Sequence, residues 1–214
     1  GRGHSTLGPL IDGLGRPYDI LALKPAFKCY PCCYETHRGL DAILHIVSNQ
    51  EIDPNAVEAV ICGMPERVAK SLIHTNPVTG LEAKFSMEYA VVAAILDKRV
   101  GLQSFTDEMV GRPSVRALLA RVQRNLRPGS DNAEEPTIVT VKLKDGREFS
   151  NSVAFPKGNP AVPLTRSELE AKYCDCAREA LSEEDVQRSL EMLSNLEELE
   201  DIRTLTSILG KKRG

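Results

Sequence analysis

Residues 137–155 read TIVTVKLKDGREFSNSVAF, and this stretch predicts a β-hairpin. Two segments, 137–143 and 148–155, flank the residues Lys144-Asp145-Gly146-Arg147. An Asp-Gly pair supplies the positive φ angles that a two-residue hairpin turn requires. The sequence therefore places antiparallel strands in the third quarter of the chain.

Strand and helix patterns alternate in front of this hairpin. A short strand is predicted at 18–23, after the break at Gly15-Arg16-Pro17, and a second strand at 57–61. Residues 36–47 predict a helix whose apolar face carries Leu40, Ile43, Leu44 and Val47. Residues 82–96 are apolar around the whole helical circumference, which is typical of a buried helix.

The end of the chain is helical. Thr165-Arg166-Ser167-Glu168 has the form of a capping box, which predicts a helix to about residue 181, and Ser182 followed by three acids caps another helix. The last helix has an apolar stripe, which requires a covering surface, formed by Val186, Leu190, Leu193, Leu196, Leu199, Ile202 and Leu209. Residues 128–136 are interpreted as a surface loop. From local patterns alone, the fold class is α+β with helical appendages.

Composition narrows the function classes. The chain has 214 residues, 42% hydrophobic and 27% charged, and a net charge of −3, so it has no basic field that would attract nucleic acid. Its longest apolar run, 90–96, is too short to cross a membrane, and no signal sequence opens the chain. We therefore expect a cytoplasmic protein without nucleic-acid or membrane partners. Because the chain begins Gly1-Arg2-Gly3 without Met, it is interpreted as a possible piece of a longer protein.

The cysteines are interpreted as reduced thiols, since no secretion signal points to a disulfide framework. They are Cys29, Cys32, Cys33, Cys62, Cys174 and Cys176. A zinc site could join Cys29-x-x-Cys32-Cys33 to Cys174-x-Cys176, but structural zinc usually draws its second pair of ligands from a knuckle, and that spacing is missing here. We expect no bound metal.

The densest group of reactive side chains lies at residues 24–37, KPAFKCYPCCYETH. This loop ends at a predicted helix N-terminus, where backbone N–H groups favour anions, and Lys28 would strengthen such a site for a carboxylate. In the alternative interpretation Lys28 is a solvated loop lysine and Thr36 is a helix cap.

A second pattern follows on the predicted helix. His37, Asp41 and His45 share one face at i, i+4 and i+8, which suits metal ligands or a proton relay. The commoner origin of such a pattern is a polar, solvent-facing stripe.

Several motifs, in order, resemble the MmgE/PrpD family. They are Lys28-Cys29-Tyr30-Pro31, Thr36-His37, Asp41-Ala42, the segment 82–89 (EAKFSMEY), the segment 112–116 (RPSVR), the Lys144-Asp145-Gly146 turn, Pro163-Leu164-Thr165, and 195–201 (NLEELED). Each motif is weak alone, but together they extend from about Tyr18 to Leu209.

The resemblance implies a large all-helical domain, built mostly from an N-terminal half, and a smaller α+β lid. Residues 1–17 would end the helical domain or form a linker, residues 18–163 would be the lid, and residues 164–214 would be helices that return to the helical domain. The apolar stripe would then pack on helices outside this sequence. The resemblance also implies a homodimer and no organic cofactor.

The family includes 2-methylcitrate dehydratase, cis-aconitate decarboxylase and iminodisuccinate epimerase, so the resemblance implies a lyase acting on a small polycarboxylate. Lys28 matches the lid lysine of the active site and is the predicted catalytic residue, with Cys33 and His37 as further substrate-binding positions. The decarboxylases have a histidine where this chain has Cys33, which favours dehydration, hydration or epimerisation. Cys33 could also be a small buried apolar residue. A different class of function stays open, in which an isolated lid is a binding module without catalysis.

Overall fold

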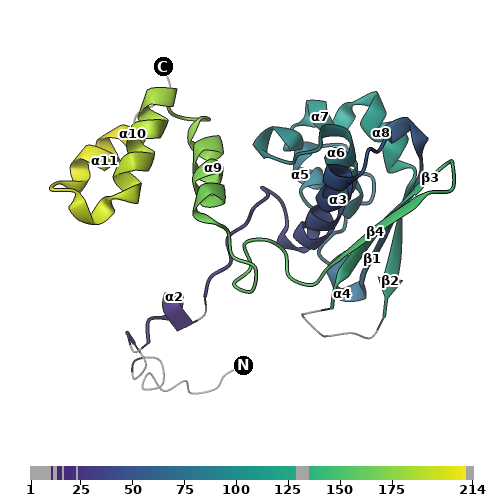
Figure 1. Ribbon diagram of the computed structural model, residues 1–214, viewed down its shortest axis with the longest axis horizontal. Coiled ribbons are helices and arrows are strands. Elements are labelled where there is room, and N and C mark those ends of the chain that lie inside the picture. Colours follow the sequence, from purple (N-terminus) through teal and green to yellow (C-terminus); the bar gives the residue numbers. More distant parts are fainter. Residues whose placement is uncertain (1–10, 12–13, 16, 23, 129–134, 211–214) are drawn as a thin grey trace, which may run out of the picture.

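The fold is α+β. The computed structural model describes residues 11, 14, 15, 17–22, 24–128 and 135–210. A four-stranded sheet with covering helices forms one body, and the helices at the C-terminal end form a second group beside it (Figure 1). Among the described residues, no helix combines the length and the apolar character needed to cross a bilayer.

The sheet is mixed, with strand order β2-β1-β3-β4. Its strands are β1 (Val57–Pro65), β2 (Val122–Arg127), β3 (Thr137–Leu143) and β4 (Glu148–Val153). β2 runs parallel to β1, whereas β3 is antiparallel to both β1 and β4. The strand predicted at 57–61 and the hairpin are confirmed. β2 was not predicted, because an edge strand reading VQRNLR has too little apolar character to be recognised.

The turn of the hairpin differs from the prediction. Gly146 has φ +89°, but Asp145 does not have a positive φ angle. The Gly146 N–H donates to the carbonyl of Leu143 at 2.9 Å, and the Leu143 N–H donates to the carbonyl of Arg147 at 2.9 Å. The connection is therefore a three-residue loop with one left-handed glycine, not a two-residue turn with two positive φ angles.

The helices of the first body are α3 (His37–Asn49), α4 (Glu66–Ala69), α5 (Gly80–Ala83), α6 (Met87–Asp97), α7 (Asp107–Gly111) and α8 (Pro113–Leu119). α3 confirms the helix predicted at 36–47. The helix predicted at 82–96 begins later, because the Ser86 hydroxyl accepts the Tyr89 N–H at 3.1 Å and so caps a new helix, α6.

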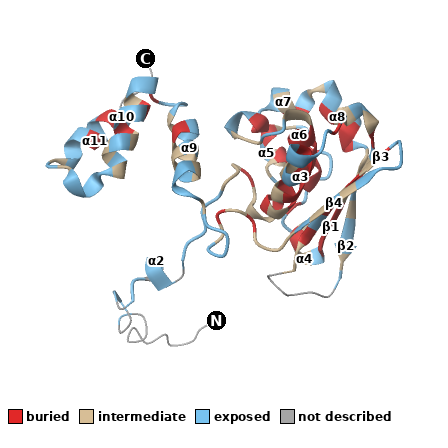
Figure 2. Cartoon of the chain, viewed as in Figure 1, coloured by how far each residue is buried: buried red, intermediate tan, exposed pale blue. Residues whose placement is uncertain are grey.

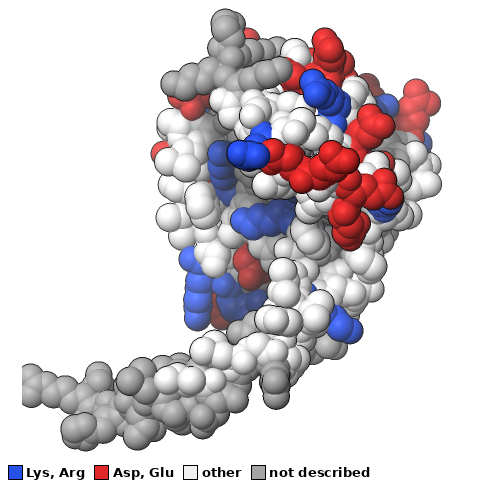
Figure 3. Space-filling model, turned by 90° about the vertical axis from the view of Figure 1, so that its left-hand side faces the viewer, with Lys and Arg blue, Asp and Glu red and all other residues white. Residues whose placement is uncertain are grey.

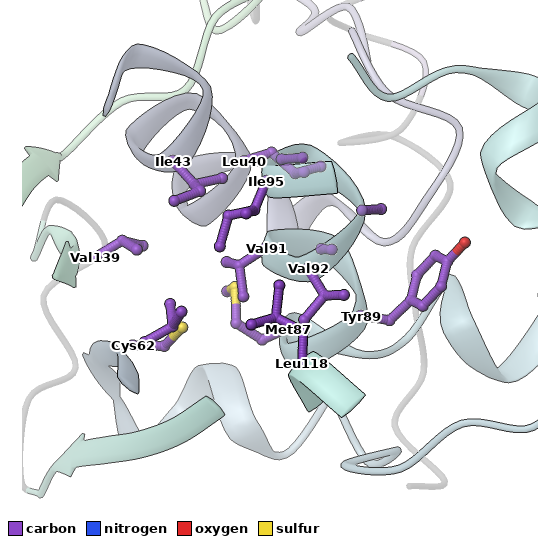
Figure 4. Packing of buried hydrophobic residues seen from close by; sticks show 14 of the residues in the cluster. Leu40, Ile43, Cys62, Met87, Tyr89, Val91, Val92, Ile95, Leu118 and Val139 are labelled. Carbon is purple, nitrogen blue, oxygen red and sulfur yellow. The ribbon is translucent and has the colours of Figure 1, made fainter. Parts of the chain in front are cut away.

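The core lies between the sheet and the helices α3 and α6. Every residue from 87 to 95 is buried, as the fully apolar pattern predicted. Figure 4 shows Ile43 of α3 and Ile95 of α6 facing one another, with Val139 of β3 and Cys62 of β1 on the sheet side. Figure 2 shows the buried positions concentrated in this first body.

The prediction of a strand at 18–23 is wrong. Residues Asp19–Ala22 form the short helix α2, while Leu23 lies outside the described residues. The Leu21 and Ala22 N–H groups both donate to the carbonyl of Tyr18, at 2.9 and 3.1 Å. A strand needs a neighbouring strand to satisfy its N–H and C=O groups, and within the described residues none pairs with this segment. The loop predicted at 128–136 falls mostly outside the described residues.

The C-terminal helices are α9 (Arg166–Ala177), α10 (Glu183–Ser194), η4 (Leu196–Glu198) and α11 (Ile202–Leu209). The capping box at Thr165 and the cap at Ser182 are confirmed, although α9 ends at Ala177. The apolar stripe does not lie on one helix, because α10 ends at Ser194 and the Asp201 side chain accepts the Arg203 N–H to start α11.

These helices have a small core of their own, formed by Cys174, Leu181, Val186 and Ile208. Part of the stripe stays uncovered: Leu193, Leu196, Ile202 and Leu209 are exposed. An apolar groove of 620 Å³ lies between α9 and α10 and includes Leu169, Tyr173 and Leu190. Figure 3 shows acidic side chains gathered on the side of the molecule where these helices lie. Three acids, Glu183, Glu184 and Asp185, open α10.

Candidate functional site

The loop that carries the predicted site residues is tied to the rest of the fold at both of its ends. The Phe27 N–H donates to the carbonyl of Gly158 at 2.8 Å, and the Cys33 N–H donates to the carbonyl of Lys84 at 2.9 Å. A one-turn helix, η1 (Tyr34–Thr36), then leads directly into α3. The loop is therefore fixed on a rigid helix rather than free in solvent.

Lys28 is exposed, and its ammonium group points back across its own loop. The Nζ atom donates a hydrogen bond to the carbonyl of Cys32 at 3.1 Å. An ammonium has three N–H donors, so this contact leaves others free for an anion. The structure thus presents a cation at the surface of a well-anchored loop.

His37 lies completely buried beneath this loop. Its ring packs edge-on against Tyr30 and tilted against Tyr34, each at 5.1 Å between ring centroids. Within the described part of the chain, neither ring nitrogen makes a well-formed hydrogen bond. Burial, and then the charge of Lys28, lower the pKa of His37 to about 4, while the carbonyl groups of Cys32 and Tyr30 oppose the shift. His37 is therefore a neutral imidazole at pH 7.

The interpretation of His37, Asp41 and His45 as a polar, solvent-facing stripe is wrong. His37 is buried and Asp41 is half-buried, so only His45 of the three side chains is exposed. Within the described residues, no three His, Cys, Asp or Glu side chains are arranged to hold a metal ion. The histidines face different environments, because the His37 ring packs against Tyr30 and Tyr34 whereas His45 is exposed.

His37 should make the protein less stable as pH falls. Its pKa is 6.5 in the unfolded chain and about 4 in the folded one, so between these values the unfolded state binds the extra proton and the free energy of unfolding decreases. The full loss is of the order of 3 kcal/mol. Urea denaturation at pH 7 and pH 4.5 measures it. The pH dependence should flatten in His37→Leu and persist in His45→Asn, and an unchanged slope in His37→Leu would contradict the assignment.

Asp41 joins the site to a distant segment. Its Oδ1 atom accepts the Tyr30 hydroxyl proton at 2.6 Å, and its Oδ2 atom accepts the Lys157 N–H at 2.6 Å. Burial raises the pKa of Asp41, and burial together with the charge of Asp41 raises the pKa of Tyr30. No local sequence pattern points to the role of Lys157, because it lies 116 residues from Asp41.

The thiols near Lys28 differ in their surroundings. Cys33 is half-buried and precedes η1 at its N-cap position, whereas Cys32 is buried with its Sγ atom 3.0 Å from the Thr36 hydroxyl. Burial raises the pKa of Cys32 to about 11. Cys29 donates to the carbonyl of Lys157 at 3.2 Å. Thr36 makes no side-chain capping bond to α3; its hydroxyl instead donates to the carbonyl of Cys33 at 2.8 Å.

We expect chelation to change neither stability nor activity. All six cysteines are free thiols, and burial raises the pKa values of Cys29, Cys32 and Cys62, so these side chains are protonated at neutral pH. Only deprotonated thiols bind zinc. Thermal melting with and without a strong chelator tests this, and a lower melting temperature with chelator would be the opposite result.

Gly158 fixes how closely the segment at Lys157 approaches the Lys28 loop. It has φ +83°, and a Cβ atom there would lie 2.0 Å from the carbonyl oxygen of Phe27. Gly146 provides a matched control, since it has φ +89° but nothing within 4 Å of its Cβ position.

Gly146→Ala should therefore lower the free energy of unfolding by only about 1–2 kcal/mol, which is the backbone cost. Gly158→Ala should lose about 1–3 kcal/mol more, because overpacking adds to that cost. Urea denaturation of the two variants measures the difference, and equal losses would show that the close approach to Phe27 does not matter.

Comparisons with known proteins identify the family of this chain. Residues 30–198 match the MmgE/PrpD C-terminal domain. The chain is 31% identical over 193 residues to cis-aconitate decarboxylase of Homo sapiens and 27% identical over 192 residues to the protein of the same name of Mus musculus. Both alignments cover 86% of this chain, which spans 39% of the length of either relative.

Proposed function

This chain belongs to the MmgE/PrpD family, and from that premise we propose that it supplies the Lys28 side of the active site of a lyase. The substrate is a small polycarboxylate, and the reaction removes a proton from the carbon next to a carboxylate. The general acid and base come from the part of the protein that the chain does not span, as the relatives' greater length allows.

The observation that carries this proposal is the placement of Lys28. The ammonium group is exposed, is held by one carbonyl at 3.1 Å, and lies near the first turn of α3, whose N-terminus favours anions. The adjacent His37 is neutral at pH 7 because its pKa is about 4. A carboxylate that reaches this loop therefore meets the positive charge of Lys28 beside a neutral imidazole.

Lys28 can lower the barrier because charge develops during the reaction. When a proton leaves the carbon next to a carboxylate, negative charge builds on the carboxylate oxygens. A fixed ammonium group stabilises that charge more in the transition state than in the ground state, and more strongly where water is excluded. The same contribution serves dehydration, hydration and decarboxylation.

Dehydration or hydration of a 2-methylcitrate-type substrate is the first candidate reaction. It is supported by Cys33, which stands where the resemblance places a histidine in the decarboxylases. Decarboxylation of cis-aconitate is the second candidate, and the names of the human and mouse relatives support it.

The test is to incubate the full-length gene product with 2-methylcitrate, citrate and cis-aconitate and to identify the products by NMR. Dehydration or hydration interconverts a hydroxy acid and an alkene, whereas decarboxylation releases carbon dioxide and leaves one carboxylate fewer. Cys33→His should raise any decarboxylation relative to dehydration. If the full-length protein turns over none of these acids, the proposal fails, and the interpretation of the chain as a binding module without catalysis is favoured instead.

A further inference from the structure

We propose that Asp41 is a positioning residue, whose carboxylate holds the Lys28 loop against the 157–159 segment and so sets where the Lys28 ammonium group lies. This inference rests on the proposed function of Lys28. It concerns a residue that does not face the substrate but determines the geometry of one that does.

Where the Lys28 ammonium lies depends on its loop. The ammonium group donates to the carbonyl of Cys32, four residues further along the same loop. A side chain that is hydrogen-bonded within its own loop moves with that loop. Misplacement of a catalytic group by about 1 Å can cost on the order of a hundredfold in rate.

Asp41 is the point where the loop meets two other parts of the fold. It lies on α3, and its two oxygens each accept one hydrogen bond of 2.6 Å, from Tyr30 in the loop and from the Lys157 backbone. Charge-assisted hydrogen bonds of this length are stronger than those between neutral groups. One half-buried carboxylate therefore connects loop, helix and the 157–159 segment.

The same segment makes further contacts with the loop, among them the hydrogen bond from the Phe27 N–H to the Gly158 carbonyl at 2.8 Å, and continues to α9. The Lys157 carbonyl accepts the Cys29 thiol at 3.2 Å, and the Asn159 side chain donates to the Tyr34 hydroxyl at 3.2 Å. The Lys157 ammonium forms an ion pair with Glu168, the residue that completes the capping box of α9. A change at Asp41 should thus alter the loop and the segment together.

Asn cannot replace Asp41 in this role. The Lys157 N–H and the Tyr30 hydroxyl both donate to the carboxylate, and an amide has one acceptor oxygen where a carboxylate has two. Asp41→Asn must therefore lose or reverse one of the two bonds while it preserves the size of the side chain. Tyr30→Phe removes one bond and leaves the Asp41 charge in place.

The experiment is a double-mutant cycle in the full-length protein. If Asp41 acts through Lys28, Asp41→Asn should lower kcat about 10- to 100-fold with little change in KM. In the Lys28→Ala background the same substitution should have almost no further effect on kcat. Tyr30→Phe should lower kcat in the same direction and to a smaller extent.

The control is Asp97→Asn. Asp97 is also half-buried and accepts two hydrogen bonds, from Arg112 at 2.8 and 2.7 Å, but it lies at the end of α6. The Asp97→Asn substitution should lower the melting temperature without lowering kcat. If Asp41→Asn and Asp97→Asn reduce kcat equally, or if Asp41→Asn reduces kcat as much without Lys28 as with it, Asp41 has only a structural role.

NMR of the lysine Cε–H groups separates this inference from the proposed function. With Lys28→Ala to assign its signal, the Lys28 resonance should shift in Asp41→Asn and Tyr30→Phe but not in Asp97→Asn. An unmoved signal overturns the positioning role of Asp41. If the signal shifts but Lys28→Ala keeps full activity, Asp41 still positions the lysine, and the proposed function of Lys28 is what fails.

Discussion

The chain alone should not turn over 2-methylcitrate, citrate or cis-aconitate. It contributes the Lys28 cation, but the histidine beside it has a pKa of about 4 and is buried, which makes it a weak and inaccessible base at pH 7. The Cys32 thiol has a pKa of about 11 and is buried as well. A reaction that loses general acid–base catalysis loses about 10²–10⁴-fold in rate. Assays of the isolated chain against the full-length protein measure this difference.

The isolated chain also tests whether the C-terminal helices need a covering surface, when its state of association is measured alone and with the helical half added. Leu193 lines the groove between α9 and α10, and Leu196, Ile202 and Leu209 are further exposed leucine and isoleucine side chains in the C-terminal helical segment. Large apolar patches are rare on monomers, so the isolated chain should self-associate, or bind the helical half that the family resemblance leads us to expect when that half is added. Turnover by the chain alone would show that the catalytic groups are misassigned. A monodisperse monomer that ignores the added half would show that these helices need no further cover.

Lys28→Ala should have the largest effect of any single substitution on turnover. A counter-charge to the transition state is worth about 3 kcal/mol, or about a hundredfold in rate. The effect on folding should be small, because the side chain is exposed and its ammonium group donates to a carbonyl of its own loop. Steady-state kinetics and thermal melting of the same samples measure both quantities.

Lys28→Arg is the informative second variant. It preserves the positive charge, but a planar guanidinium group places that charge differently from a compact ammonium group. We expect it to lose activity too. If Lys28→Arg is fully active while Lys28→Ala is not, the loop needs only a positive charge, and the exact position of the ammonium group does not matter.

Local chemistry in the sequence was sufficient for the elements that form the core. The helix α3, the buried helix α6 and the hairpin could be predicted because periodicity, caps and turn residues are encoded by neighbouring positions. The prediction at 18–23 failed because a strand depends on a partner elsewhere, and the described part of the chain provides none for it. The prediction of one last helix carrying the whole apolar stripe failed, because the break at Asn195 interrupts a stripe that looks continuous in sequence.

The site could be predicted only in part. Lys28, Cys33 and His37 are close in sequence, so the resemblance could name them together. The depth of His37 depends on how the aromatic rings of Tyr30 and Tyr34 fold over it, and its low pKa follows from that burial. The link from Asp41 to Lys157 joins a side chain to a backbone N–H. Every residue except proline has such a donor, so the residue type at 157 does not indicate the contact.

The most direct measurement of the central claim is the rate at which solvent deuterium enters the organic acid at the carbon next to a carboxylate. Full-length wild-type protein and Lys28→Ala would be compared by NMR in deuterated water with saturating substrate. Our account predicts a rate about a hundredfold lower in Lys28→Ala, with nearly the same melting temperature. Equal rates in the two proteins would contradict it, because proton transfer at carbon would then proceed without the Lys28 charge.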